Sequence, residues 1–260
     1  MNRIEAAFQN KPIFMPYYPV GYPDLATSID VLEALAKNGA DLIEVGLSFS
    51  DPLADGPVIQ KATQIALAQG LTTQQVLAAV GELRQRGVSI PLILMGYYNP
   101  ILAYGLERFV DEAIAAGADG FIIPDLPPEE ADEFTTVLSA AGRQPALPQI
   151  TMLAPTTSDE RMEAITRNAK GFIYLVSVTG TTGERQDISA GLAELVARVR
   201  QQTRLPVCVG FGIGTPQQAK AVGAIADGII VGTACIRALE NSPNPVETAR
   251  EFARSFREAI

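Results

Sequence analysis

Short apolar segments alternate with amphipathic segments along the whole chain, and the alternation occurs eight times. Continuous apolar runs of this length are typical of strands covered on both faces, as in parallel sheets. The predicted strands are Ile13–Pro19, Ala40–Gly46, Pro91–Gly96, Gly120–Asp125, Ala146–Thr151, Gly171–Ser177, Pro206–Phe211 and Asp227–Gly232. Between them apolar residues recur at helical spacing, as at Leu25, Ile29 and Leu32. Strands and helices that alternate in this way predict a parallel sheet.

Eight strand–helix units are the number that closes a (β/α)8 barrel. The competing architecture, an open doubly wound sheet, would place G-x-G-x-x-G after the first strand, whereas Gly212 and Gly214 give only G-x-G late in the chain. We therefore predict an α/β fold, with residues 1–260 as one single-domain TIM barrel that carries extra short helices. Pro57–Gly87 holds enough pattern for an inserted pair of helices, and Asn2–Gln9 is expected to close the barrel bottom.

The junctions that lead into strands also repeat. Gly-Ala or Ala-Asp precedes three of the strands, at Asp41, Asp119 and Asp227. Repeated junctions of this kind indicate one βα unit copied around a ring.

Composition limits the possible partners. The net charge of −9 and pI near 4.7 argue against a nucleic-acid or anionic-membrane surface, although a local basic pocket remains allowed. The start Met1–Glu5 lacks the regions of a signal peptide, and no apolar stretch is long enough to span a bilayer. Cys208 and Cys235 have no CxxC spacing and are expected to be buried free thiols. The expected location is the cytoplasm, or the plastid stroma for a plant protein.

The chain contains no histidine. It therefore cannot build a Ser-His-Asp or Cys-His arrangement, nor a metal centre with His ligands, and no metal site is expected. General acid and base catalysis must fall to Asp, Glu, Lys or Tyr.

Two carboxylates stand out. Glu44 is a lone acid in the apolar run Ala40–Gly46, and Asp55 lies in the Pro- and Gly-rich segment Phe49–Pro57, which is typical of a loop. Active sites of barrels lie at the carboxyl ends of the strands. We expect Glu44 to have a raised pKa through burial and Asp55, on a more hydrated loop, to stay ionised, so that an acid and a base coexist. The alternative is that Glu44 is a structural polar group bound to a Lys or a backbone amide.

Glycines cluster after the last three predicted strands, in 179–183, 210–215 and 232–234. Such clusters, with helices that begin near Thr215 and Thr233, favour a phosphate site made of backbone N–H groups over simple tight turns. Tyr174 needs a partner for its hydroxyl if it is buried, and a ligand at the barrel mouth would provide one. Residues 178–187 fit either a mobile lid or an ordinary exposed loop.

The segment Leu42–Gln60 strongly resembles the signature of the tryptophan synthase alpha subunit, and the similarity extends over essentially the whole chain. The resemblance implies a carbon–carbon lyase of tryptophan biosynthesis that cleaves indole-3-glycerol phosphate to indole and glyceraldehyde 3-phosphate by a retro-aldol route. It implies no cofactor in this chain, with pyridoxal phosphate only in a partner beta subunit, and an alpha2beta2 complex. Asp51–Asp55 and Pro100–Tyr104 are the expected contacts with that partner.

Site roles follow from the same resemblance. Glu44 corresponds to the acid/base that protonates indole C3 and takes the glycerol hydroxyl proton, and Asp55 to the group that binds the indole N–H. The residues that resemble the indole pocket and positioning groups are Tyr17, Ile122, Tyr174, Phe211 and Thr182. Those that resemble the phosphate cradle are Gly183, Gly212, Gly232 and Thr233.

Three positions depart from the family pattern: Val178 where some members carry Arg, Thr181 where Val is usual, and Tyr22 where Asp is common. They leave open a stand-alone lyase that releases free indole. A non-catalytic subunit that binds phosphate and activates a partner is a further alternative. Another phosphate-sugar aldolase or isomerase rests on fold analogy alone, and none of the predicted strands carries the lysine of a Schiff-base enzyme.

Overall fold

Eight parallel strands form one sheet in the computed structural model, in the order β4-β3-β2-β1-β8-β7-β6-β5. The structure describes residues 1–140, 147–176, 189–210 and 212–260. The strands are β1 Ile13–Pro19, β2 Ile43–Gly46, β3 Leu92–Met95, β4 Gly120–Ile122, β5 Thr151–Leu153, β6 Ile173–Val176, β7 Val207–Gly210 and β8 Gly228–Val231. The helices are α1 Arg3–Ala7, α2 Leu25–Lys37, α3 Pro57–Ala68, α4 Thr73–Gln85, α5 Tyr98–Tyr104, α6 Leu106–Ala116, the 3-10 turn η1 Pro128–Glu130, α7 Asp132–Ser139, α8 Asp159–Thr166, α9 Ser189–Gln202, α10 Pro216–Gly223, α11 Thr233–Leu239 and α12 Pro245–Ala259.

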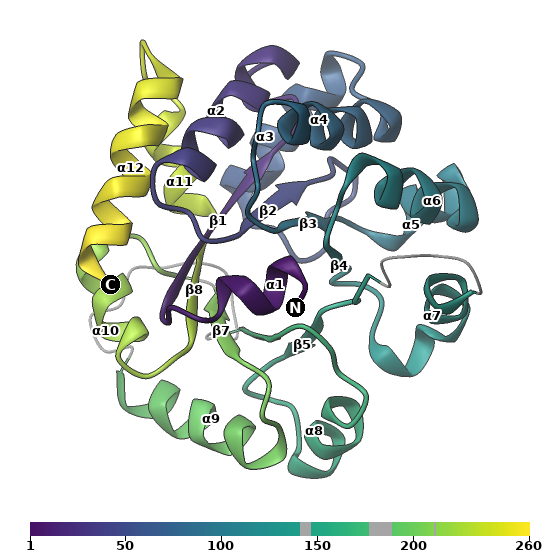
Figure 1. Cartoon of the computed structure of the whole chain (residues 1–260), viewed down its shortest axis with the longest axis vertical. Helices are drawn as coiled ribbons and strands as arrows, with labels where there is room; N and C mark the ends of the chain where they lie inside the picture. The colour runs from purple at the N-terminus through teal and green to yellow at the C-terminus, as the bar shows by residue number, and fades with distance from the viewer. Residues whose placement is uncertain (141–146, 177–188, 211) are drawn as a thin grey trace.

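The two ends of this sheet meet and close a barrel. Phe121 in β4 pairs with Gln149 through a parallel bridge just before β5. The Phe121 N–H donates to the Pro148 carbonyl at 2.9 Å, and the Ile150 N–H donates to the Phe121 carbonyl at 2.7 Å. The strands lie at the centre of the molecule and the helices surround them (Figure 1). The predicted (β/α)8 architecture is therefore confirmed.

The predicted bounds of the fifth strand were wrong. The expectation was Ala146–Thr151, whereas β5 is Thr151–Leu153, and Ala146 lies outside the described residues. Pro148 has no N–H to donate, so the segment around it makes only the single bridge to β4 instead of a ladder. Regular pairing begins where Thr151 faces Ile173 of β6.

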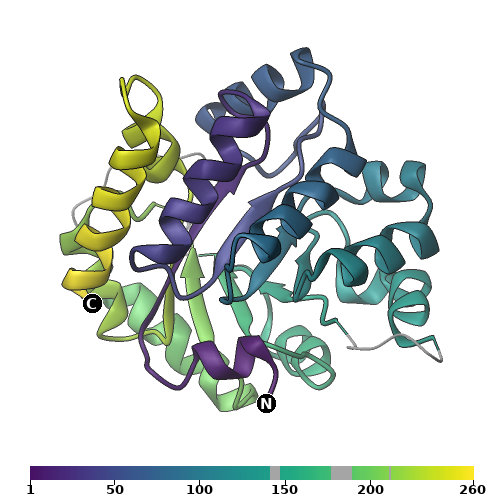
Figure 2. The ribbon, with the colours of Figure 1, turned by 45° about the horizontal axis from the view of Figure 1, so that its top comes forward.

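The barrel interior holds its own apolar cluster, which includes Met15, Leu42, Ile93 and Ile122. The helix α1 adds Ile4 and Phe8 to this cluster, and the Phe8 ring lies 5.8 Å from the ring of Phe172. The helix crosses one end of the barrel, which is the end where the strands begin (Figures 1 and 2). It confirms the predicted short helix at the barrel bottom, and α3 with α4 confirms the predicted pair of helices after β2.

Three aspartates join neighbouring strands at this same end. Asp41 precedes β2, and its Oδ2 accepts the Phe14 N–H at 2.8 Å while its own N–H donates to the Phe14 carbonyl at 2.9 Å. Asp119 binds Leu92 of β3 in the same way, at 2.8 and 2.9 Å. The repeated junctions in the sequence therefore have a common structural basis, in which an aspartate at the start of one strand holds the previous strand.

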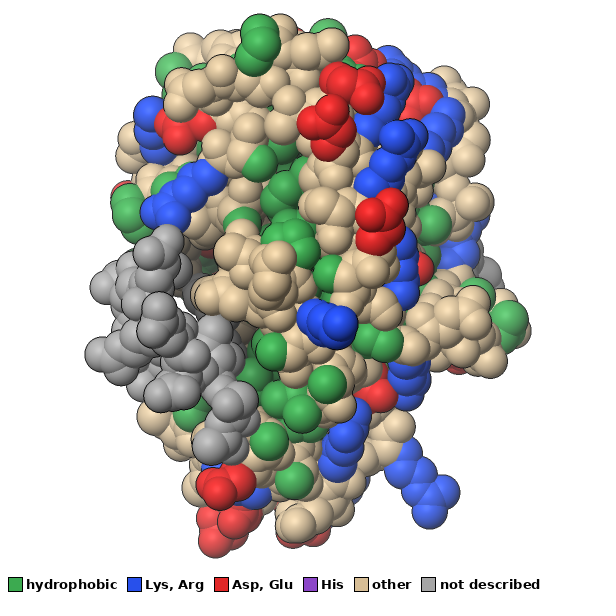
Figure 3. All heavy atoms as spheres, turned by 90° about the vertical axis from the view of Figure 1, so that its left-hand side faces the viewer, with side chains coloured by type: hydrophobic (Ala, Val, Ile, Leu, Met, Phe, Trp, Pro, Cys, Tyr) green, Lys and Arg blue, Asp and Glu red, His purple; other side chains and the backbone are tan. Residues whose placement is uncertain are grey.

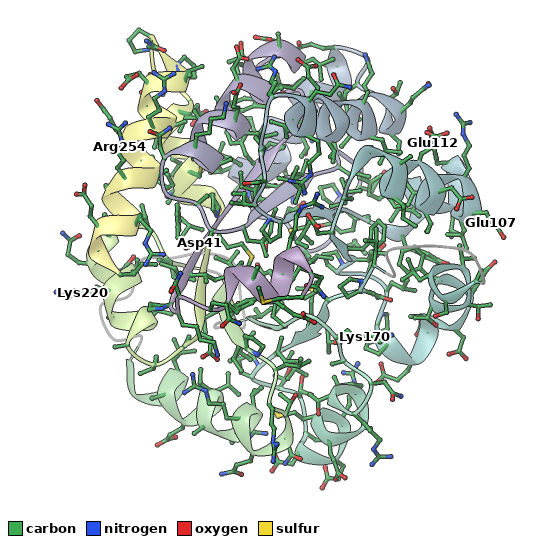
Figure 4. All side chains as sticks on the ribbon, viewed as in Figure 1. Asp41, Glu107, Glu112, Lys170, Lys220 and Arg254 are labelled. Atoms are coloured by element: carbon green, nitrogen blue, oxygen red, sulfur yellow. The ribbon has the colours of Figure 1, made fainter. Side chains whose placement is uncertain are left out.

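Asp227 repeats the pattern with Val207 of β7, with both bonds at 2.9 Å. Each of the three carboxylates is also neutralised by cations. Asp41, which is labelled in Figure 4, pairs with Arg257. Asp119 pairs with Arg84 and Arg3, and Asp227 with Lys11 and Arg200. These three acids lie at the end of the barrel where the strands begin, and the fold provides each of them with hydrogen-bond donors and an opposite charge.

Lys and Arg side chains alternate with Asp and Glu on the face of the molecule that carries α10, α11 and α12 (Figure 3). Within the described ranges, no helix is both long enough and apolar enough to pass through a bilayer.

Candidate active site

Glu44 points into the barrel. It lies in β2 two residues after Leu42, which belongs to the interior cluster, and side chains two residues apart on a strand share a face. In register it lies between Tyr17 of β1 and Ile93 of β3, and only 1% of its surface is exposed. The apolar sequence around Glu44 is thus the interior wall of the barrel.

This buried acid is not neutralised by a cation. In the part of the chain that the structure describes, Glu44 forms no ion pair, and its Oε1 has no hydrogen-bond partner. Burial raises the pKa of Glu44 to about 8, because the charged form loses its hydration. The alternative interpretation was that Glu44 is a structural polar group bound to a Lys or a backbone amide. Among the described residues, neither kind of group binds this oxygen. The carboxyl group is protonated at neutral pH and is available as an acid.

Asp55 lies in the segment between β2 and α3 and is half-buried. Burial raises the pKa of Asp55 to about 6, and a hydrogen bond from the Tyr97 hydroxyl opposes that rise. The side chains around the loop remove part of its water, although Asp55 stays less buried than Glu44. Asp55 still has the lower pKa of the two acids, so it is mainly ionised at pH 7 while Glu44 is mainly protonated.

Both acids act on the same two tyrosines. Burial is the main cause of the raised pKa of Tyr17, and the charges of Asp55 and Glu44 add to it. The pKa of Tyr174 is raised by burial and then by Glu44 and Asp55. Glu44 lies beside Tyr17 in the register of β2 and β1, and Asp55 follows the carboxyl end of β2, so both acids lie close to the same two tyrosines at the end of the barrel where the strands finish.

Each tyrosine hydroxyl lies over a glycine of the next strand. A Cβ added at Gly46 would lie 2.5 Å from the Tyr17 Oη, and a Cβ added at Gly210 would lie 2.5 Å from the Tyr174 Oη. Only a residue without a side chain leaves this space. The sequence had suggested that the cluster with Gly210 approaches an anion, but Gly210 itself makes room for Tyr174.

Ile122 ends β4 and is fully buried in the interior cluster, so it contributes to the apolar wall three strands away from Tyr17 in β1. Gly212 and Gly232 follow the neighbouring strands β7 and β8. Gly212 has a φ of +86°, and no described residue would lie within 4 Å of a Cβ added there. Gly232 is the N-cap of α11, which Thr233 begins. Phe211, Thr182 and Gly183, like Val178 and Thr181, lie outside the described residues.

Sequence reasoning missed Tyr97, which hydrogen-bonds to Asp55, and it missed the packing role of Gly46. Tyr97 and Tyr98 are adjacent in a segment that follows a strand, and nothing in the sequence indicates which of them contacts Asp55. Cys208 and Cys235 are buried free thiols, as expected. Among the described residues, no three Cys, Asp or Glu side chains gather closely enough to hold a metal ion.

Comparisons with known proteins identify the family of the chain. The family model described as tryptophan synthase alpha chain matches residues 4–259. A tryptophan synthase alpha chain of Chloroflexus aurantiacus is 50% identical over 248 residues, which cover 95% of this chain and 92% of that relative. Its counterpart in Dehalococcoides mccartyi is 44% identical and is covered completely, as is this chain.

Solved structures give the same result. Tryptophan synthase subunit alpha from Legionella pneumophila superposes with a TM-score of 0.86 at 39% identity, over 100% of this chain and 98% of that one. Mycobacterium tuberculosis tryptophan synthase superposes with a TM-score of 0.89 at 34% identity, over 100% and 98%. The chain belongs to the tryptophan synthase alpha chain family.

Proposed function

We propose that this chain is a carbon–carbon lyase that cleaves indole-3-glycerol phosphate to indole and glyceraldehyde 3-phosphate, with residues 1–260 acting as one domain. The observation that carries the proposal is the pair of unlike acids at the barrel mouth. Glu44 is buried, lacks a partner for Oε1 and has a pKa of about 8, whereas Asp55 has a pKa of about 6. One group therefore holds a proton at neutral pH and the other holds a charge.

In the first proposed step, Glu44 donates its proton to C3 of the indole ring. The ring loses its aromaticity and becomes a cation that can accept an electron pair. Asp55, as a carboxylate, accepts a hydrogen bond from the ring N–H and stabilises that positive charge. The apolar wall that includes Ile122 and the buried ring of Tyr17 strengthens both interactions, because water is excluded there.

In the second step, the ionised Glu44 removes the proton of the glycerol hydroxyl next to the ring. The carbon–carbon bond breaks, its electron pair restores the aromatic ring, and the hydroxyl carbon becomes the aldehyde of glyceraldehyde 3-phosphate. Glu44 recovers its proton, so the cycle is balanced without any cofactor in this chain. Activity should then rise as pH passes about 6, where Asp55 ionises, and fall above about 8, where Glu44 loses its proton.

The substrate phosphate would bind backbone N–H groups at the ends of β7 and β8, through Gly212, Gly232 and Thr233. We assign Gly183 to the same cradle and Thr182 and Phe211 to the substrate pocket on the family resemblance alone. The proximity of β7 and β8 and the positive φ of Gly212, which suits glycine, support the first three assignments.

A beta subunit that carries pyridoxal phosphate is the proposed partner, in an alpha2beta2 complex. The segments Asp51–Asp55 and Pro100–Tyr104 are the proposed contacts. They carry Leu53 and Leu102, whose surfaces are 86% and 43% exposed, and exposed apolar side chains favour a protein interface.

The test is indole release from indole-3-glycerol phosphate by the purified chain, with and without a tryptophan synthase beta subunit. We expect slow release by the chain alone and faster release with the partner. Turnover that the partner does not change would favour the stand-alone lyase. Substrate binding without turnover in either condition would contradict the proposal and favour a non-catalytic subunit.

A further inference from the structure

Tyr97 occupies a fixed position between β3 and α5. The residue before it, Gly96, donates its N–H to the Ile122 carbonyl of β4 at 3.1 Å. The residue after it, Tyr98, donates its N–H to Asp125 Oδ1 at 2.9 Å. The backbone on both sides of Tyr97 is therefore tied to the segment around β4, and its side chain projects from a rigid base.

From that base Tyr97 contacts the β2–α3 segment at three points. Its Oη accepts the Ala54 N–H at 3.0 Å, and its hydroxyl donates to the Asp55 carboxylate. Its ring lies 5.6 Å from the ring of Phe49. The tyrosine itself is 4% exposed, whereas Ala54 is exposed, so one buried side chain holds an exposed segment.

We propose that Tyr97 is a positioning residue for the lyase reaction, which holds the β2–α3 segment so that the Asp55 carboxylate faces the indole N–H. This inference rests on the proposed function. The hydroxyl uses its lone pair for the Ala54 N–H and its proton for Asp55, so one group fixes both the backbone and the carboxylate. The Phe49 ring contact fixes the plane in which that hydroxyl lies.

Several titratable groups face Asp55. Tyr17 reaches it from β1, Tyr174 from β6 and Tyr97 from the end of β3, and Asp125 acts on Tyr97 in turn. Glu44 in β2 acts on the same two tyrosines as Asp55. Of these groups, Tyr97 is the one with a hydrogen bond that lowers the pKa of Asp55 and so keeps the buried carboxylate charged.

The test is Tyr97→Phe, which retains the ring against Phe49 and removes only the hydroxyl. Loss of the hydrogen bond should raise the pKa of Asp55, so the acidic limb of the pH profile, on which kcat/KM rises with pH, should move upward by about one pH unit. At pH 7 kcat/KM should fall about twofold because less Asp55 is ionised, and about tenfold in all because the carboxylate is also less well positioned. The matched control is Tyr98→Phe, which removes the neighbouring hydroxyl beside Glu133 and should leave that limb in place. If Tyr97→Phe lowers the thermal unfolding midpoint but leaves the acidic limb of the pH profile in place, Tyr97 has only a structural role. If Tyr98→Phe shifts that limb as much as Tyr97→Phe does, the inference is also overturned.

A second measurement separates this inference from the proposed reaction. The Asp55 carboxyl carbon is titrated by NMR in 13C-labelled protein, with Asp55→Asn to assign the signal. A higher pKa in Tyr97→Phe supports the coupling even if the wild type releases no indole, in which case only the proposed reaction fails. An unchanged titration in Tyr97→Phe overturns the coupling whether or not the wild type is active.

Discussion

Carboxyl groups that are partly or fully buried occur at both ends of this barrel, but their surroundings differ. At the end where strands begin, Asp41, Asp119 and Asp227 each accept a backbone N–H from the previous strand and pair with a cation. At the end where strands finish, Glu44 is more deeply buried, yet its Oε1 has no partner. The same functional group, a carboxyl, therefore stabilises the fold at one end and is left unsatisfied at the other.

The difference shows how a single barrel separates stability from chemistry. An acid whose lone pairs and charge are satisfied by the fold has no free capacity to exchange a proton with a ligand. An acid that lacks partners costs folding free energy, but it retains a high proton affinity that a reaction can use. The following predictions test whether this separation is real.

The largest effect is expected at the unsatisfied end. Glu44→Gln keeps the shape of the side chain and removes the exchangeable proton, so kcat for indole release should fall about 10²–10⁴-fold. Steady-state kinetics with the beta subunit measures it, with Glu251→Gln on the exposed surface of α12 as the control. A loss smaller than about tenfold would deny Glu44 an acid/base role.

The matching test at the satisfied end is Asp119→Ala. Removing this carboxylate leaves the Leu92 N–H and the Arg84 guanidinium, which is 14% exposed, without their acceptor. We expect unfolding free energy to fall by about 3–5 kcal/mol, with kcat/KM of the folded protein little changed. Urea titration measures the loss. Asp30→Ala, which breaks an exposed ion pair with Arg86, should cost less than about 1 kcal/mol. Equal losses of unfolding free energy in Asp119→Ala and Asp30→Ala would show that Asp119 stabilises the fold no more than an exposed ion pair does.

A third prediction concerns the pH dependence of stability. The folded pKa of Glu44, about 8, lies above its ordinary value of 4.5, so the folded state binds this proton more tightly than the unfolded chain. The wild type should therefore lose more stability than Glu44→Gln as pH rises from 4.5 to 8. Asp55, whose raised pKa contributes in both proteins, cancels in the comparison, so the stability difference between them should change by about 2–4 kcal/mol in favour of the variant. Urea titrations of both proteins at several pH values test this. Parallel curves would mean that Glu44 carries no excess proton affinity.

The smallest effect is expected at Gly46. A methyl group there would lie 2.5 Å from the Tyr17 hydroxyl, so the tyrosine must move, at a cost of about 1–3 kcal/mol, and kcat/KM should fall with it. Gly81→Ala in α4 is the control, because its added methyl would lie 4.0 Å from the Cα of Ala116 in α6, an ordinary contact, and should stabilise α4 by about 0.5–1 kcal/mol. Calorimetry compares the two variants. An unaffected Gly46→Ala would show that Tyr17 does not need this space.

Much of the fold was predictable because its signals are local. Seven of the eight predicted strands overlap the observed ones over most of the observed length, since a strand buried on both faces is apolar throughout. The prediction of the fifth strand was wrong because the segment around Pro148 forms only one bridge to β4, and a local sequence pattern does not show which residues will pair with a strand distant in sequence. Glu44 was identifiable because a lone acid in an apolar run is unusual, whereas nothing local distinguished Tyr97 from Tyr98.

The sequence by itself determined the barrel class, the apolar frame around Glu44 and, through the absence of histidine, the restriction of proton transfer to other side chains. Only the tertiary structure decided that Asp55 is partly desolvated, that Tyr97 binds it, and that Gly46 and Gly210 receive tyrosine hydroxyls. The physical reason is that residue type fixes what a group can donate or accept, whereas its pKa and its partners depend on how much water and which side chains the folded chain brings to it.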